Sequence, residues 1–89
     1  MSYLVTLHRR ADRALERLPE REARRIVLIL KEMESEPLSG DIRRLSGSSR
    51  PLWRRRVGEY RIVFSVSIER EVVIVERIER RTGGMYERF

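Results

Sequence analysis

The fold is decided by residues 52–68, which read LWRRRVGEYRIVFSVSI. Two runs rich in β-branched, aromatic and arginine residues flank the pair Gly58 and Glu59. A two-residue connection that begins with glycine suits a type II′ turn, which joins two antiparallel strands in a hairpin. We therefore predict the strands Leu52–Val57 and Tyr60–Ile68, with a register that the short turn fixes.

The predicted register divides the side chains of the hairpin between two faces, because directly opposed residues share a face and side chains alternate along a strand. One face is apolar and is the expected core face; its single misfit is Arg55, which we expect to snorkel toward solvent. The other face is basic near the turn, where Arg54, Arg56 and Arg61 lie close together. Like charges this close repel one another, so these arginines either have acidic partners or await an anion.

The chain has 89 residues, which suits one small domain over residues 1–89. It has no cysteine and a single histidine, His8, so a thiolate or histidine metal cluster is not expected, and neither is another cofactor. His8 closes the first predicted strand and suits a surface or helix-start position. No apolar run approaches the roughly 20 residues of a membrane span, and no signal peptide is visible. We therefore expect a cytoplasmic protein without a membrane partner.

Basic side chains outnumber acidic ones by 20 to 14, for a net charge of +6 and an isoelectric point near 10.9. Lys31 is the only lysine. This balance favours an anionic partner such as nucleic acid, an acidic protein or a membrane surface, and arginine suits bidentate contacts with phosphate. An arginine-rich surface of no particular function is the alternative.

The rest of the chain predicts a short strand at Tyr3–Leu7 and an amphipathic helix at Arg9–Leu18. A second helix is expected from Pro19 to Glu36, followed by a long loop over 37–51 and a last strand at Glu71–Ile78. We predict an α+β fold, ordered β-α-α-β-β-β. It has a small antiparallel-rich sheet, two N-terminal helices packed on one face, and an open basic face.

The face on which the last strand places its arginines depends on the turn before it. A two-residue turn at Glu69 and Arg70 puts Arg61 opposite Ile78 and brings Arg80 to the same face as Arg61. Val72 and Ile74 then also lie on that open face, together with Ile78. A three-residue turn reverses the assignment.

Two segments, Leu45 to Gly47 and Trp53 to Phe64, resemble the RelE/ParE superfamily of toxins, and the resemblance covers nearly the whole chain. RelE-like members of this superfamily are ribosome-dependent mRNA endonucleases. ParE-like members inhibit DNA gyrase and lack the nuclease residues. The residues described next favour the RelE-like branch.

The RelE-like site combines two basic residues on one strand, often lysines, with an arginine after the hairpin turn, an arginine at the end of the last strand and a C-terminal tyrosine. The resemblance implies catalytic roles for Arg56, Arg61, Arg80 and Tyr86, and RNA-binding roles for Arg54 and Arg81. If the strand pair falls two residues earlier, on Leu52 and Arg54, one basic member is missing. Arginine at both places cannot transfer protons.

The implied chemistry is metal-independent cleavage, in which the 2′-OH of the RNA attacks the adjacent phosphate. Tyr86 then either accepts the proton or stacks on a base. The implied partners are a cognate RelB-like antitoxin, the ribosome and mRNA. Three hypotheses stay open: a RelE-like endoribonuclease toxin, a ParE-like gyrase inhibitor, and a non-catalytic basic module that binds RNA or protein.

Overall fold

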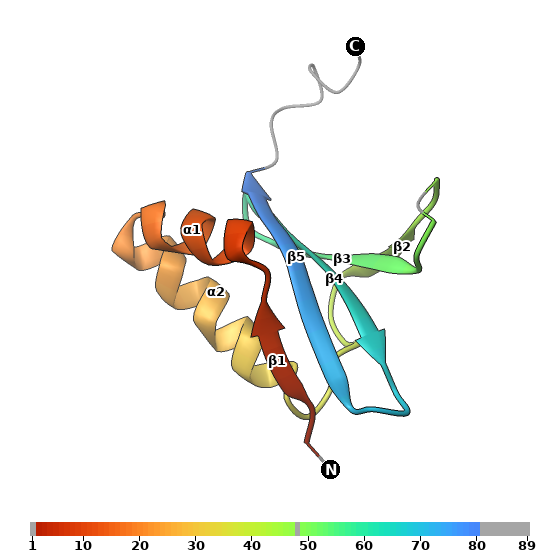
Figure 1. Cartoon of the computed structure of the whole chain (residues 1–89). Coiled ribbons are helices and arrows are strands. Elements are labelled where there is room, and N and C mark those ends of the chain that lie inside the picture. Colours follow the sequence, from red (N-terminus) through yellow and green to blue (C-terminus); the bar gives the residue numbers. More distant parts are fainter. Residues whose placement is uncertain (1, 48, 81–89) are drawn as a thin grey trace.

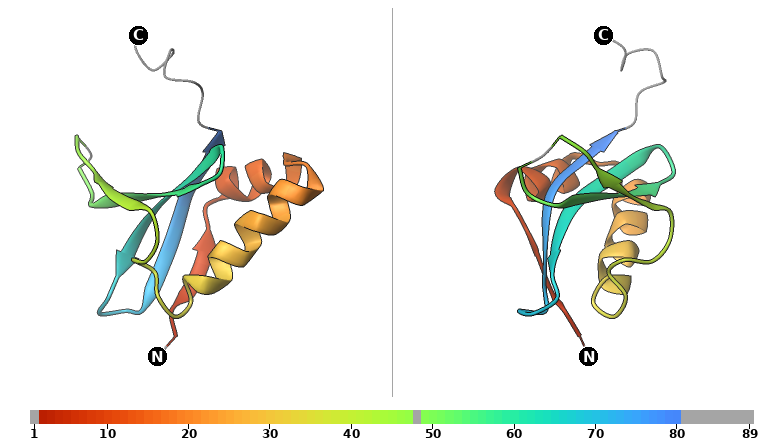
Figure 2. Two further views of the ribbon diagram at one scale, coloured as in Figure 1. Left: turned by 180° about the vertical axis from the view of Figure 1, so that it is seen from behind. Right: turned by 90° about the vertical axis from the view of Figure 1, so that its right-hand side faces the viewer.

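The computed structural model describes residues 2–47 and 49–80, which form two helices and a five-stranded sheet (Figure 1). The elements are β1 (Leu4–Leu7), α1 (Arg9–Arg17), α2 (Glu20–Glu32), β2 (Ile42–Leu45), β3 (Leu52–Val57), β4 (Tyr60–Ser67) and β5 (Val72–Arg80). Both helices lie on the same side of the sheet (Figure 2). The predicted α+β class and the placement of both helices on one face are confirmed.

The strand order in the sheet is β1-β5-β4-β3-β2. β1 runs parallel to β5, and the other three pairings are antiparallel. The strand β2 is an addition to the prediction, which assigned residues 37–51 to a loop. Ile42 pairs with Arg55 and Leu45 with Leu52, so β2 satisfies an edge of β3 that would otherwise leave its backbone groups unpaired.

The first helix begins at His8, whose Nδ1 accepts a hydrogen bond from the backbone N–H of Arg10 at 3.2 Å. This contact confirms His8 as a helix-start residue, because a side-chain acceptor satisfies an N–H that the first turn leaves free. The second helix ends at Glu32, four residues before the predicted end at Glu36. Just beyond the helix, the carbonyl of Glu34 accepts from the N–H of Tyr3 at 2.7 Å, which ties this segment to the residue before β1.

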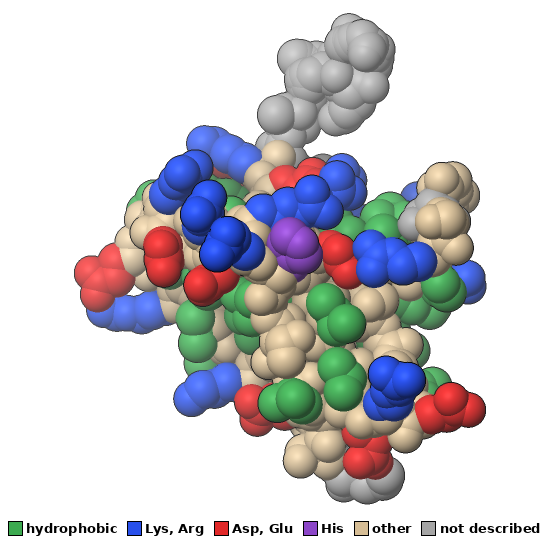
Figure 3. Space-filling model, viewed as in Figure 1, with side chains coloured by type: hydrophobic (Ala, Val, Ile, Leu, Met, Phe, Trp, Pro, Cys, Tyr) green, Lys and Arg blue, Asp and Glu red, His purple; other side chains and the backbone are tan. Residues whose placement is uncertain are grey.

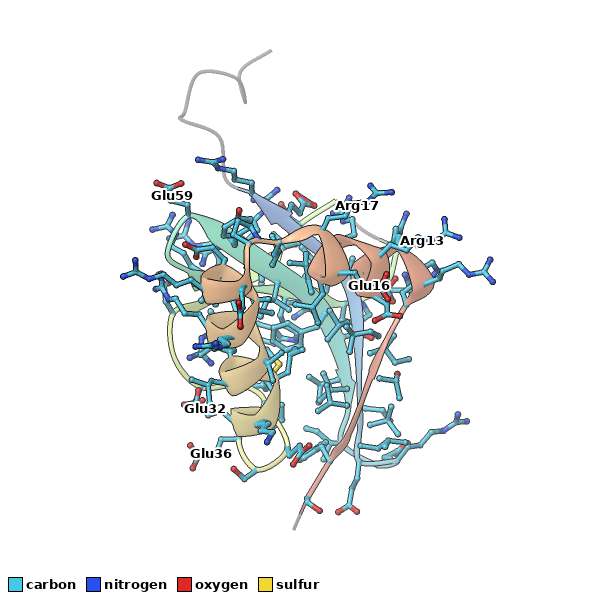
Figure 4. All side chains as sticks on the ribbon, turned by 90° about the vertical axis from the view of Figure 1, so that its left-hand side faces the viewer. Arg13, Glu16, Arg17, Glu32, Glu36 and Glu59 are labelled. Carbon is cyan, nitrogen blue, oxygen red and sulfur yellow. The ribbon has the colours of Figure 1, made fainter. Side chains whose placement is uncertain are left out.

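The hydrophobic core lies between the helices and the sheet, as the side chains in Figure 4 show. Its fully buried members include Ala11 of α1, Ile26 and Met33 of the second helical segment, and Phe64 of β4. The apolar spacing of α2 places Val27 next to Ile26, but 38% of Val27 is exposed. The buried stripe of α2 is therefore narrower than the sequence indicates.

The predicted hairpin register is confirmed: Val57 pairs with Tyr60, Arg56 with Arg61 and Trp53 with Phe64. Gly58 has φ +61°, as the first position of the glycine turn requires. A Cβ at this position would lie 2.8 Å from Nη1 of Arg25, so the turn also has little room for a side chain.

A β-bulge at Glu76 shifts the register of the last strand by one residue from the predicted register. Ser67 pairs with Val72 and Phe64 with Val75, as a two-residue turn predicts. The bulge then inserts one extra residue, and Val63 pairs with Arg77.

Beyond the bulge every side chain of β5 changes face relative to the prediction, because the side-chain period of a strand is two. Arg61 therefore pairs with Glu79 rather than with Ile78, and Ile78 belongs to the core. Arg80 pairs with Tyr60, so it lies on the helix side rather than on the face of Arg61. The expectation that these two arginines share a face is wrong.

Candidate functional site

The open face of the sheet, away from the helices, carries four arginines on its three central strands. Arg54 and Arg56 come from β3, Arg61 from β4 and Arg77 from β5; we call these four residues the arginine face. Val63 pairs with Arg54 on one side and with Arg77 on the other, and it is fully buried although no helix lies over it. The aliphatic stems of the arginines therefore pack around it.

Asp41, in the linker between α2 and β2, contacts Arg54 and Arg56, the two arginines of β3 that point to the open face. Nη1 of Arg54 donates to the Asp41 carbonyl at 3.2 Å and lies 3.4 Å from Asp41 Oδ1. Nη1 of Arg56 lies 3.9 Å from Asp41 Oδ2, and its backbone N–H donates to the Asp41 carbonyl at 3.0 Å. One residue thus holds both guanidinium groups near each other.

Glu79 does the same for the arginines of β4 and β5. Nε and Nη2 of Arg61 donate to Glu79 Oε1 at 3.3 and 3.2 Å. Nε of Arg77 lies 3.1 Å from Glu79 Oε2. The two oxygens of this carboxylate therefore face different guanidinium groups, which fixes the spacing of Arg61 and Arg77.

The four guanidinium groups share two carboxylates, so these described residues leave two positive charges in excess on the arginine face. Both alternatives that the sequence left open hold in part, since acidic partners exist and positive charge remains. The side chains of Arg56 and Arg61 are 43% and 40% exposed, whereas that of Arg54 is 10% exposed. The side chain of Arg77 is 44% exposed, so an incoming anion meets Arg56, Arg61 and Arg77 before Arg54. Arg56 and Arg61 are directly opposed across the hairpin and can contact the same anion.

Arg80 stands apart from the arginine face at the end of β5. Its Nη2 lies 2.8 Å from Glu59 Oε1 in the hairpin turn, and both side chains are largely exposed. Such a surface ion pair contributes about 0–1 kcal/mol to stability, so an anion can replace the glutamate at little cost. Arg81 and Tyr86, which the sequence also places in the site, lie outside the described residues.

A second basic surface lies on α1. Arg9, Arg13 and Arg17 follow one another at intervals of four, which aligns them on one side of a helix. All three are exposed, and within the described ranges no carboxylate is recorded in an ion pair with them. Figure 3 shows a concentration of basic side chains over α1, and Figure 4 shows Arg13 and Arg17 projecting outward.

Comparison with known proteins identifies the family. No protein-family model matches the chain. A protein of Methanocaldococcus jannaschii named as a RelE1 toxin is 28% identical over 87 residues, which cover 94% of this chain and 96% of that protein. A chain of the RelE–RelB complex from Pyrococcus horikoshii OT3 is 30% identical, with a TM-score of 0.82, and the match covers 93% of this chain and 99% of that one. The chain belongs to the RelE toxin family.

A second solved structure agrees with this assignment. A chain of the RelBE2 toxin–antitoxin complex from Mycobacterium tuberculosis is 26% identical to the present RelE-family chain, with a TM-score of 0.81. The match covers 91% of this chain and 100% of that one. The predicted resemblance to the RelE branch is thereby confirmed.

Sequence reasoning missed two residues of this candidate site, Arg77 and Asp41. Arg77 reaches the arginine face only because of the bulge, and the signal for it is a break in the apolar pattern of β5. Val73 and Val75 alternate regularly, but the next core residue is Ile78, three positions later. Asp41 lies in a linker with no periodic pattern, so nothing in the sequence indicates its contacts.

Two further observations concern metal binding and membrane spans in the part of the chain that the structure describes. No group of three His, Cys, Asp or Glu side chains is arranged to hold a metal ion in the part of the chain that the structure describes. Neither α1 nor α2 is long and apolar enough to cross a membrane.

Proposed function

We propose that this RelE-family chain is the toxin of a toxin–antitoxin pair and an endoribonuclease that cleaves mRNA on the ribosome without a metal ion. One observation carries the proposal: Arg56 and Arg61 are directly opposed on an open face that has more guanidinium groups than carboxylates. Two exposed guanidinium groups across a rigid hairpin suit one phosphodiester, because each offers several donors in a fixed geometry.

In the proposed reaction the 2′-OH of one nucleotide attacks the adjacent phosphorus. A bond forms between O2′ and phosphorus while the bond to the 5′-oxygen breaks, which leaves a 2′,3′-cyclic phosphate and a 5′-OH. Negative charge grows on the phosphoryl oxygens in the transition state. Guanidinium groups fixed in advance stabilise that charge more than they stabilise the bound RNA, which lowers the barrier.

Each arginine has a proposed role that follows from its place. Arg61 and Arg80 stabilise the phosphoryl oxygens, with Arg80 reaching from the end of β5 once it leaves Glu59. Arg54 and Arg56 hold the RNA backbone and the leaving group, and Arg81 adds a contact to the RNA. Arg77, through Glu79, maintains the position of Arg61.

The proton of the 2′-OH needs an acceptor, and an arginine cannot serve because it stays protonated. Tyr86 is the proposed acceptor, and the 5′-oxygen takes a proton from solvent as it leaves. Nearby guanidinium groups favour the phenolate form of a tyrosine, which is the form that accepts a proton. In the alternative role Tyr86 stacks on a base and orders the RNA.

The proposed partners fit other surfaces of the chain. A RelB-like antitoxin is proposed because the relatives from Pyrococcus horikoshii and Mycobacterium tuberculosis were solved in toxin–antitoxin complexes. Leu4 of β1 and Ile74 of β5 are 63% and 38% exposed. They lie on the same side of the sheet as the arginine face, toward the start of β5, and offer an apolar contact for the antitoxin. The exposed arginines of α1 suit the phosphates of ribosomal RNA. Because ribosomes and mRNA are the proposed partners, we propose that the protein acts in the cytoplasm.

The test is a brief induction of the protein in growing cells, with mRNA 5′ ends mapped by primer extension. New ends inside translated frames are expected, and Arg61→Ala should abolish them. Arg24→Ala is the matched control, because it removes an arginine from an exposed ion pair on α2, at 2.6 Å from Glu20, far from the site. Intact mRNA with growth arrest would point to gyrase inhibition instead, and intact mRNA with normal growth to a non-catalytic module.

A further inference from the structure

Arg55 occupies a position where the hairpin pattern calls for an apolar residue. It points to the helix side of β3, between Arg54 and Arg56, which point to the open face. Its side chain does not snorkel, since only 10% of it is exposed. The buried guanidinium group donates to Glu32 Oε1 at 2.9 Å and to the carbonyl of Ser39 at 3.0 Å.

These contacts clamp the linker between α2 and β2 from the inside. Glu32 is the last residue of α2 and lies at the end of the helix that leads into the linker (Figure 4). Gly40 lies against the guanidinium group, and a Cβ there would come within clashing distance of Arg55 Cζ. Gly40 also has φ +82°, a conformation that glycine adopts without strain.

The clamped linker continues directly into Asp41, which contacts Arg54 and Arg56 on the other side of the sheet. The carbonyl of Asp41 accepts from Arg54 Nη1 and from the Arg56 backbone, and its carboxylate faces both side chains. Arg55 therefore holds Ser39, which lies two residues before Asp41 in the linker. Among the described residues, its guanidinium group has hydrogen bonds to Ser39 and Glu32 and none to Arg54 or Arg56.

We propose that Arg55 is a positioning residue for the arginine face, acting through the linker and Asp41 to set where the guanidinium groups of Arg54 and Arg56 lie. The effect on catalysis rests on the proposed nuclease function, whereas the effect on geometry does not. Without the clamp, Asp41 keeps only its own contacts with β3, so its carboxylate is less firmly placed and the like charges of Arg54 and Arg56 move apart. A displacement of catalytic groups by about 1 Å is enough to slow an enzyme substantially.

The experiment is a double-mutant cycle with Arg55→Met and Asp41→Asn, in which methionine keeps much of the buried volume of Arg55. Cleavage of mRNA on programmed ribosomes is measured in single turnover at saturating toxin, so that changes in affinity drop out. Each single variant is expected to cleave about tenfold more slowly, and the double variant no more slowly than either. Arg24→Met should leave the rate unchanged.

A merely structural role of Arg55 predicts a different pattern. In that case Arg55→Met lowers the melting temperature but leaves the cleavage rate of the folded variant unchanged. Alternatively, the losses of the two single variants multiply, and the double variant cleaves about a hundredfold more slowly than the wild type. Either result would overturn the proposal. If Arg55→Met does not fold, Glu32→Gln replaces it in the cycle, because it weakens the same clamp at its helix end, and the same absence of a further loss with Asp41→Asn is required.

The geometry is followed separately by the NMR signals of the Nε–Hε groups of Arg54 and Arg56. Arg55→Met and Asp41→Asn are expected to shift both signals, and Arg24→Met neither. If the wild-type chain cleaves no RNA and these signals still shift, the nuclease proposal fails and the positioning role stands. If it cleaves RNA and the signals do not shift in Arg55→Met, only the positioning role fails.

Discussion

Deletion of Glu76 from the middle of β5 is expected to leave the fold intact, although removal of a residue from a central strand normally reverses the faces of its neighbours. Glu76 is the extra residue of the bulge. Its removal joins Val75 to Arg77, and each of these keeps its partner on β4, Phe64 and Val63. The arginine face and the core therefore keep their residues.

The cost of the deletion follows from the contacts of Glu76. Its carboxylate is 6% exposed and lies 3.0 Å from Nη1 of Arg50, and its carbonyl accepts from Nε of Arg10 at 3.2 Å. The Arg50 side chain is 57% exposed and stays hydrated, and loss of the buried carboxylate also removes its desolvation cost. We expect a loss of about 1–3 kcal/mol. At about 4–8 °C per kcal/mol for a domain of this size, the melting temperature falls by roughly 10 °C.

Thermal unfolding followed by circular dichroism measures this, with Glu76→Ala as the comparison. The deletion should cost little more than Glu76→Ala, because both remove the same carboxylate and neither alters the register. Deletion of Val63 is the control: the extra residue of the bulge belongs to β5 and not to β4, so Arg61 would take the buried place of Ile62 and the protein should not fold. An unfolded Glu76 deletion beside a folded Glu76→Ala would refute the reasoning.

Four further predictions concern charge, chemistry, packing and association. Glu79→Gln removes the carboxylate charge that Arg61 and Arg77 share, so it should tighten the binding of a short single-stranded RNA by about 1 kcal/mol, or roughly fivefold. Fluorescence anisotropy measures this affinity. Glu20→Gln makes the same change in net charge on α2 and should leave the affinity unchanged. Tyr86→Phe should relieve growth inhibition while the melting temperature stays within the error of the wild type, and full toxicity of this variant would remove Tyr86 from the proton transfer. Phe64→Ala empties a fully buried site and should cost about 3–5 kcal/mol in denaturant unfolding, whereas a cost below about 1 kcal/mol would place Phe64 outside the core. Association with the antitoxin, measured by stopped flow, should slow as salt rises; a rate independent of salt would exclude electrostatic steering.

The register of the hairpin could be predicted to the residue because its information is local, although β4 ends at Ser67, one residue before the predicted end. The turn pair Gly58 and Glu59 sets the register, and the register alone decides that Arg54, Arg56 and Arg61 share a face. No contact from a distant part of the chain is needed for that step. The helices were found for a similar reason, since their apolar spacing lies within each segment.

The last strand and the linker could not be predicted in the same way. The bulge at Glu76 changes the face of every following residue, and a turn-based register carries no information about it. The contacts of Asp41 depend on a linker that is held by Arg55 and Glu32, which are far apart in sequence. These are the places where tertiary contacts, rather than local pattern, determine which side chains reach the site.

The three consecutive arginines of β3 show how one residue type acquires different tasks from strand geometry alone. Alternation sends Arg55 inward, where its charge is met by Glu32 and a carbonyl, and sends Arg54 and Arg56 outward to share one aspartate. Stability explains the inner arginine, since its charge is fully partnered. It does not explain the outer pair and their neighbours Arg61 and Arg77, because two carboxylates among four guanidinium groups leave repulsion that a simple change to uncharged residues would relieve. Anionic groups that supply the missing negative charge are the condition under which this face is electrostatically balanced, and two successive phosphates of a bound RNA meet it.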